Sequence, residues 1–192
     1  MATCSSAIGT DPPRVIRDAV AGDASAIAAI YSHEVLHGTA TYEVEPPCAE
    51  AMARRMSEGL AAGYPWRVAL VGGDIAGYAC ASPYRTRPGY RWTVEDSIYV
   101  SPRFHRRGIG AALLADLIER CERLGLRQMV EVIGDESNLA SIALHERAGF
   151  RLAGRFPGIG RKHGRWLTGV QMLRALGDGD STPPFAEPGP TA

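Results

Sequence analysis

The chain has 192 residues, 45% of them hydrophobic, which fits one domain with a sizeable core. Lysine plus arginine and aspartate plus glutamate both number 21, and this zero net charge argues against a nucleic-acid-binding protein. No apolar run is long enough to span a bilayer, and the first residues lack the basic and apolar regions of a secretory signal. Four scattered cysteines without a C-x-x-C pair favour free thiols and a cytoplasmic location.

The two ends of the chain differ from its middle. Residues 1–13 are small and polar, and residues 177–192 are rich in glycine and proline, so both segments are predicted to be disordered. They flank one folded domain, which is expected at residues 14–176.

Strand and helix patterns alternate between these ends, and Asp23 is the expected N-cap of the first helix. In chain order we predict a strand at 14–19, helices at 23–36 and 49–61, strands at 66–71, 75–82 and 90–100, a helix at 108–124, a strand at 128–133, a helix at 138–148, and strands at 150–156 and 166–173. This order indicates an α/β (α+β) fold with one mixed sheet, partly antiparallel and partly parallel, and helices on both faces.

A glycine turn follows the strand that ends at Pro102 and opens the next helix. It reads His105-Arg106-Arg107-Gly108-Ile109-Gly110-Ala111. Backbone N–H groups at a helix start have no helical acceptor and attract phosphate, and two arginines add charge. The turn lacks the Lys-Ser/Thr of a Walker A loop and the third glycine of a dinucleotide fingerprint. It therefore predicts another phosphorylated cofactor, and the alternative is a plain tight turn with surface arginines.

The string His33-Glu34-Val35-Leu36-His37 matches the zinc-binding pattern H-E-x-x-H. The match is short, Gly38 follows at once, and no clear third ligand comes downstream. We therefore expect no metal site here, and instead a helix end that lines a pocket.

Two motifs flank the glycine turn. Val100-Ser101-Pro102 precedes it, and residues 138–150 read N-x-x-S-x-x-L-H-E-x-x-G-F. With the order of elements, these motifs resemble the GNAT acyltransferase superfamily over about residues 14–174. The stretches 64–66, 82–95 and 162–166 further resemble the phosphinothricin and methionine sulfoximine/sulfone N-acetyltransferases.

The resemblance implies a GNAT-like, mostly antiparallel central sheet and acetyl-CoA as the cofactor. The pyrophosphate is expected on the N–H groups of the glycine turn, and the pantetheine arm along the splayed edge of the strand before it. The residues expected to bind the cofactor are Ile98, Tyr99, Val100, Arg106, Arg107, Gly108, Ile109, Gly110, Ala111, Asn138 and Ser141. Two positions depart from the family pattern: His105 replaces the usual Gln or Arg, and Thr168 replaces a frequent Asp.

Two residues are candidates for catalysis. Amide formation from a thioester needs a neutral amine, and Glu95 stands where the family places its proposed general base. The alternative for Glu95 is a surface-facing strand residue. His145 stands where many GNAT enzymes have a tyrosine, so it either donates a proton to the departing CoA thiolate or packs against the pantetheine without titrating.

Four residues are candidates for substrate binding. Arg85 and Arg87 are two apart on an extended segment, so they face the same way and suit a carboxylate, phosphinyl or sulfonyl oxygen. Tyr42 and Tyr90 are candidates for an apolar wall around a methionine-like side chain. The alternatives are solvated loop arginines and ordinary core aromatics.

The expected activity is transfer of acetyl to the α-amine of a small amino-acid analogue such as phosphinothricin, methionine sulfoximine or methionine sulfone. Transfer is expected to be direct, in a ternary complex. The alternatives are a different amine, such as a polyamine or a protein N-terminus, and a non-catalytic acyl-CoA-binding sensor. The resemblance also implies a homodimer, with no nucleic-acid or membrane partner.

Overall fold

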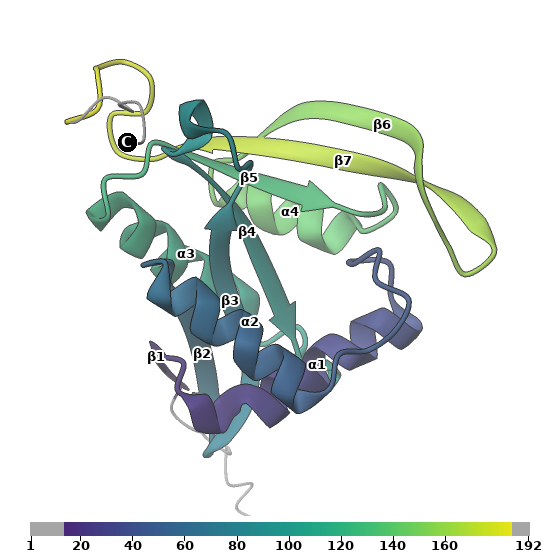
Figure 1. Cartoon of the computed structure of the whole chain (residues 1–192). Helices are drawn as coiled ribbons and strands as arrows, with labels where there is room; N and C mark the ends of the chain where they lie inside the picture. The colour runs from purple at the N-terminus through teal and green to yellow at the C-terminus, as the bar shows by residue number, and fades with distance from the viewer. Residues whose placement is uncertain (1–13, 186–192) are drawn as a thin grey trace, which may run out of the picture.

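Seven strands form one sheet within residues 14–185, which are the residues that the computed structural model describes (Figure 1). The strands are β1 (Arg14–Asp18), β2 (Trp66–Val71), β3 (Asp74–Pro83), β4 (Thr93–Val100), β5 (Gln128–Ile133), β6 (Arg151–Lys162) and β7 (Arg165–Ala175). Their spatial order is β1-β2-β3-β4-β5-β7-β6, and every neighbouring pair is antiparallel except β4 and β5. The predicted mixed, mostly antiparallel sheet is confirmed.

Helices cover both faces of the sheet, as predicted (Figure 1). The α-helices are α1 (Ala24–His37), α2 (Ala49–Ala61), α3 (Ile109–Arg123) and α4 (Leu139–Arg147). Leu113 and Met129 are buried in the core beneath α3 and α4, whereas Ile27 and Met52 belong to a second core beneath α1 and α2. None of the helices within the described range is long and apolar enough to cross a membrane.

Two strand ends lie three or more residues from the position that the sequence predicts. β4 begins at Thr93 rather than at residue 90, because Pro88–Tyr90 forms a 3-10 turn before it. β6 runs to Lys162 rather than to residue 156, although Gly158 and Gly160 disfavour a strand. Pairing with β7 carries β6 through these glycines, and the register shifts between Phe156 and Gly160.

The last described residues fold back against the domain. Arg127 donates hydrogen bonds to the carbonyl and hydroxyl oxygens of Thr182 and to the carbonyl of Pro183. The remainder of the two segments predicted to be disordered, residues 1–13 and 186–192, lies outside the described residues.

Candidate active site

The two parallel strands of the sheet separate partway along their length. β4 and β5 pair from Thr93 with Gln128 to Asp96 with Glu131. Beyond that point β4 stays paired with β3, and β5 stays paired with β7. The backbone groups of residues 98–100 that face β5 therefore have no strand partner in the described structure. We call this opening the fork; an extended ligand could pair with its edge as an added strand.

The glycine turn lies at the end of β4. Gly108 has a left-handed φ of 73°, which a glycine adopts without strain, and α3 begins at the next residue. No side chain caps this helix end, so its first N–H groups stay available to an anion. The ring Nε2 of His105 lies 2.9 Å from the carbonyl oxygen of Val100 and ties the turn to the strand. The turn and the fork edge together fit a ligand that joins phosphate to an extended amide-bearing arm.

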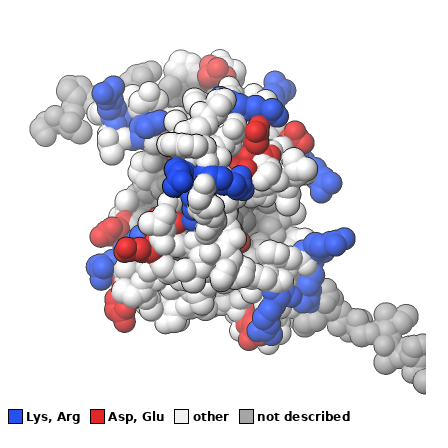
Figure 2. Space-filling model, turned by 90° about the vertical axis from the view of Figure 1, so that its right-hand side faces the viewer, with Lys and Arg blue, Asp and Glu red and all other residues white. Residues whose placement is uncertain are grey.

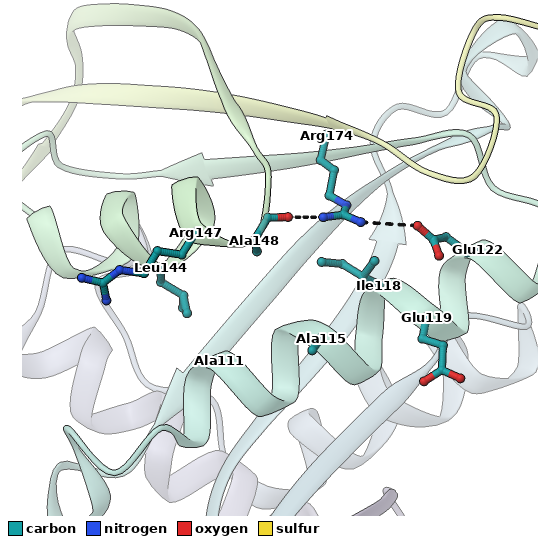
Figure 3. A pocket seen from close by; sticks show the side chains of 9 residues that line it. All are labelled: Ala111, Ala115, Ile118, Glu119, Glu122, Leu144, Arg147, Ala148 and Arg174. Carbon is teal, nitrogen blue, oxygen red and sulfur yellow. Dashed lines mark hydrogen bonds and ion pairs between the residues drawn. The ribbon is translucent and has the colours of Figure 1, made fainter.

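A groove between α3 and α4 continues from this turn (Figure 3). It has a volume of about 410 Å³, and Ala111 lies at its turn end. Arg174 lies beside it, where the guanidinium donates to the carbonyl of Ala148 and lies 3.5 Å from the Glu122 carboxylate. The groove offers space for the part of a ligand that extends beyond the phosphate turn.

Glu95 lies one residue before the last β4–β5 pair. Its side chain is half-buried on the same face of β4 as Tyr99, which packs against the core beneath α1 and α2. Burial raises the pKa of Glu95, the charge of Asp96 raises it further, and the charge of Arg85 opposes the rise. A carboxylate with a raised pKa beside the fork suits a general base.

Arg85 and Tyr90 lie in one cluster near Glu95. The Arg85 guanidinium sits 5.0 Å from the centre of the Tyr84 ring, and the Tyr84 and Tyr90 rings meet edge to face at 5.7 Å. Arg87 is exposed, and its carbonyl accepts the Tyr90 N–H at the 3-10 turn. Arg85 is also exposed, and its charge acts on Glu95, so the structure brings these two residues near each other.

Tyr42 lies elsewhere, at the end of β5. Its hydroxyl donates to the carbonyl of Gly134 at 2.7 Å, and its ring fills the space that a Cβ would take at Gly160. Tyr42 and Tyr90 share no ring contact in the part of the chain described, so the predicted common wall is not assembled by direct contact.

The β6–β7 hairpin holds the Tyr42 segment in place. The buried Lys162 ammonium donates to the carbonyls of Glu34 and Thr41, at 3.2 and 2.8 Å. Asp135 accepts from both Thr39 and Arg165. Figure 2 looks onto this side of the molecule, where basic side chains gather near the centre among acidic ones.

His145 belongs to a buried polar cluster that sequence reasoning missed. Its Nε2 lies 3.1 Å from the Asp96 carboxylate and 3.8 Å from that of Glu131, and its Nδ1 lies 2.8 Å from the Ser141 carbonyl oxygen. Burial lowers the pKa of His145, but the Asp96 hydrogen bond and the two carboxylate charges outweigh it and raise it to about 9. The sequence did contain a signal for this cluster: Asp96 and Glu131 are acidic residues within otherwise apolar strands, TVEDSIYV and QMVEVI.

Asn138 and Ser141 connect this cluster to the start of α4. Asn138 Oδ1 accepts the Ser141 N–H at 3.1 Å and caps the helix, which leaves its two amide N–H donors for other partners. The Ser141 hydroxyl lies 3.4 Å from both Glu131 and His145. Two residues depart from the family pattern, and neither belongs to this cluster. His105 is in the glycine turn, and the Thr168 carbonyl accepts the Glu136 N–H.

The H-E-x-x-H string lies at the end of α1. The His33 and His37 rings are 4.9 Å apart, and both are exposed. Within residues 14–185 no third potential ligand joins this pair.

Comparisons with known proteins place this geometry in a family. The profile of the acetyltransferase (GNAT) family matches residues 26–150. The phosphinothricin N-acetyltransferase of Alcaligenes faecalis is 45% identical over 171 residues, which cover 89% of this chain and 85% of that enzyme. The L-methionine sulfoximine/L-methionine sulfone acetyltransferase of Pseudomonas paraeruginosa is 40% identical over 153 residues, with coverages of 79% and 88%.

A solved structure agrees in both sequence and shape. The crystal structure of a GNAT superfamily phosphinothricin acetyltransferase from Sinorhizobium meliloti, in complex with acetyl-CoA, has a TM-score of 0.88 to this chain. The two are 49% identical, and the match covers 92% of this chain and 96% of that one. The protein therefore belongs to the acetyltransferase (GNAT) family and is an N-acetyltransferase of that family.

Proposed function

We propose that this enzyme uses acetyl-CoA to acetylate the α-amine of a small amino-acid analogue such as phosphinothricin, methionine sulfoximine or methionine sulfone. The observation that carries the proposal is the fork, which opens one residue after Glu95 and leads to the uncapped glycine turn of α3. The names of the two relatives support the substrate class, and the acetyl-CoA held by the Sinorhizobium meliloti relative supports the cofactor.

The cofactor would lie along the fork and the turn. The N–H groups of residues 106–111 would hold its pyrophosphate. The edge of residues 98–100, which has no strand partner among the described residues and whose Val100 carbonyl accepts from His105, would pair with its pantetheine arm through the remaining backbone groups. Asn138 would donate an amide N–H, and Ser141 would contact the arm beside it. When bound, acetyl-CoA supplies the activated acetyl thioester.

Glu95 would act as the general base. An α-amine has a pKa of about 7.7–8.0 and is mostly protonated at neutral pH, so it must lose a proton before it can attack. Burial raises the pKa of Glu95, so its carboxylate is a stronger base than that of an exposed glutamate. Glu95 takes this proton directly or through one water.

Arg85 would bind the acidic end of the substrate. Its guanidinium lies close enough to Glu95 for its charge to lower the carboxyl pKa, so an anionic group on Arg85 would lie near the base. Arg87 would add a second cation, and Tyr90 and Tyr42 would contact the apolar part of the substrate. This arrangement favours an anionic amino-acid analogue over a polyamine.

Transfer would be direct rather than through a cysteine. Cys80 lies on β3 beside β4, and burial, together with the charges of Asp96 and Glu95, raises its pKa to about 12. At neutral pH its thiol stays protonated and is a poor nucleophile.

Thiol release from acetyl-CoA tests this function. We expect release with L-phosphinothricin, L-methionine sulfoximine and L-methionine sulfone, and little with spermidine or a short peptide. Release with spermidine or the peptide alone would overturn the substrate class. Coenzyme binding by calorimetry without release would instead indicate an acyl-CoA sensor or an untested amine. The homodimer and the cytoplasmic location stay predictions, and light scattering and cell fractionation would check them.

A further inference from the structure

The proposed reaction leaves a thiolate that needs a proton. A thiol has a pKa of about 8.5, so the departing sulfur is mostly protonated once it reaches water at neutral pH. The family resemblance makes His145 a candidate for this step, with packing against the pantetheine as the alternative, and its side chain is only 1% exposed. Its Nδ1 faces the Ser141 carbonyl and its Nε2 faces Asp96, so both ring protons have protein acceptors.

Glu131 is the more accessible carboxyl of the cluster. It is the β5 member of the last β4–β5 pair, so it lies where the fork opens. Its side chain is 12% exposed, against 1% for His145 and 0% for Asp96. The Ser141 hydroxyl lies 3.4 Å from one carboxyl oxygen, and His145 Nε2 lies 3.8 Å from the other.

We propose that Glu131 is the catalytic acid, with Asp96 and His145 as positioning residues behind it; this rests on the proposed function. The carboxylic O–H bond of Glu131 breaks, an S–H bond forms on the thiolate, and Glu131 is left as a carboxylate. The carboxylate recovers a proton from solvent when CoA leaves. No electron transfer or further reactant is needed.

The surroundings of Glu131 keep it protonated at neutral pH. Burial and the charge of Asp96 raise its pKa to about 8, although the charge of His145 opposes the rise. The charge of Glu95 on β4 raises the pKa of Glu131 further, whereas the hydrogen bond from the Ser141 hydroxyl on α4 lowers it.

A phenol and two thiols also interact with the cluster. Tyr99 on β4 interacts with Glu131, and burial raises the pKa of Tyr99 well above its usual range, so the phenol stays neutral. Cys80 on β3 and Cys121 on α3 both interact with Asp96, and burial raises the pKa of each to about 12. An acid with a pKa of about 8 is close to a thiol in strength, so proton transfer between them is nearly balanced. A cluster with ionised Asp96, doubly protonated His145 and neutral Glu131 also carries no net charge, which suits its burial.

The test is the pH dependence of kcat for Glu131→Gln, with thermal unfolding and coenzyme affinity measured alongside. Glutamine keeps the shape but cannot give up a proton in this range, so we expect kcat to fall by about 10²-fold, the lower end of general-acid contributions. In the wild type, kcat should fall as pH rises through the pKa of Glu131, because the acid loses its proton. We expect this alkaline limb of the profile to disappear in Glu131→Gln. Glu131→Asp should restore part of the rate together with the limb. Glu58→Gln, on the exposed face of α2, is the matched control and should leave the profile unchanged.

A second variant separates Glu131 from His145. In His145→Asn, the positive charge that lowers the pKa of Glu131 is gone, so the alkaline limb should move to higher pH. Disappearance of the limb in His145→Asn, or its survival in folded Glu131→Gln, would overturn Glu131 as the acid while leaving the proposed function intact. Absence of wild-type turnover with every amine of the panel would instead overturn the proposed function and this acid with it.

Discussion

Glu95 and Asp96 are neighbours in sequence but serve opposite faces of β4. Side chains alternate along a strand, so Glu95 points toward the α1 and α2 side and Asp96 toward α3 and α4. Asp96 meets His145 there and is fully buried, whereas Glu95 stays half-buried near Arg85. One strand thus supplies the proposed base on one face and the anchor of a buried polar cluster on the other.

Replacement of Glu95 by glutamine tests its role as a base. We expect kcat/KM to fall by about 10²–10⁴-fold, because general-base assistance is removed while the shape is kept. In the wild type the rate should rise with pH through a pKa above the ordinary glutamate value of about 4.3, since burial raises the pKa of Glu95. Fixed-time assays of thiol release from acetyl-CoA between pH 5 and 9 measure both effects. Near-normal turnover of Glu95→Gln would refute the assignment of Glu95 as the base.

Single residues differed in how well the sequence predicted them. The glycine turn was visible because its signal is local: two arginines and two closely spaced glycines between a strand and a helix. Asp96 and Glu131 gave a weaker signal, acidic residues within apolar strands, because the partner that explains them, His145, lies on a helix later in the chain. A buried acidic residue is explained only by a partner that tertiary structure provides.

At the scale of elements, the fork and the turn form one continuous edge. β4 loses β5 as a partner after Asp96 and ends four residues later, at Val100. A 3-10 turn at Pro102–Phe104 then leads into the glycine turn that begins α3. The last paired residue therefore sets where an extended ligand could start to pair with β4, and the helix end sets where its phosphate could bind.

Gly108→Ala tests the turn. Gly108 has a φ of 73°, and alanine in the left-handed region costs about 1–2 kcal/mol. We expect this loss of stability together with a raised KM for acetyl-CoA. Gly125→Ala is the matched control: Gly125 has a φ of 76°, but it lies at the far end of α3. Denaturant unfolding should show similar losses for both, and an unchanged KM in Gly108→Ala would contradict a phosphate-binding turn.

Elements with strong local patterns were predicted with the same bounds as observed. The helix at 49–61 and the strands at 66–71 and 128–133 are examples. β6 was predicted too short because its glycines have low strand propensity, and only pairing with β7 extends it. The fork itself was expected from the family resemblance, since no local pattern tells where two distant strands part.

At the scale of the whole molecule, the buried cluster makes stability depend on pH. His145 has a folded-state pKa of about 9, so its contribution is complete below about pH 6.5, the unfolded value, and is lost as pH rises through 9. Glu131, with a pKa of about 8, likewise holds a proton that the unfolded chain has already lost. The free energy of unfolding should therefore fall between pH 6.5 and 8.

Urea unfolding between pH 6.5 and 8 measures how steeply the free energy of unfolding changes with pH. Replacing Asp96 by Asn, Glu131 by Gln and His145 by Gln together removes the titrating groups with little change of volume, so the slope should become flatter. Equal slopes for the wild type and this triple variant would refute the assigned protonation states.

Lys162 has a consequence for how the molecule is made. Its ammonium closes the end of α1 through the carbonyls of Glu34 and Thr41, which lie 128 and 121 residues earlier in the chain. During translation, α1 and the segment that holds Tyr42 leave the ribosome long before Lys162 is synthesised. The nascent chain therefore completes this side of the domain last, when the β6–β7 hairpin emerges and docks.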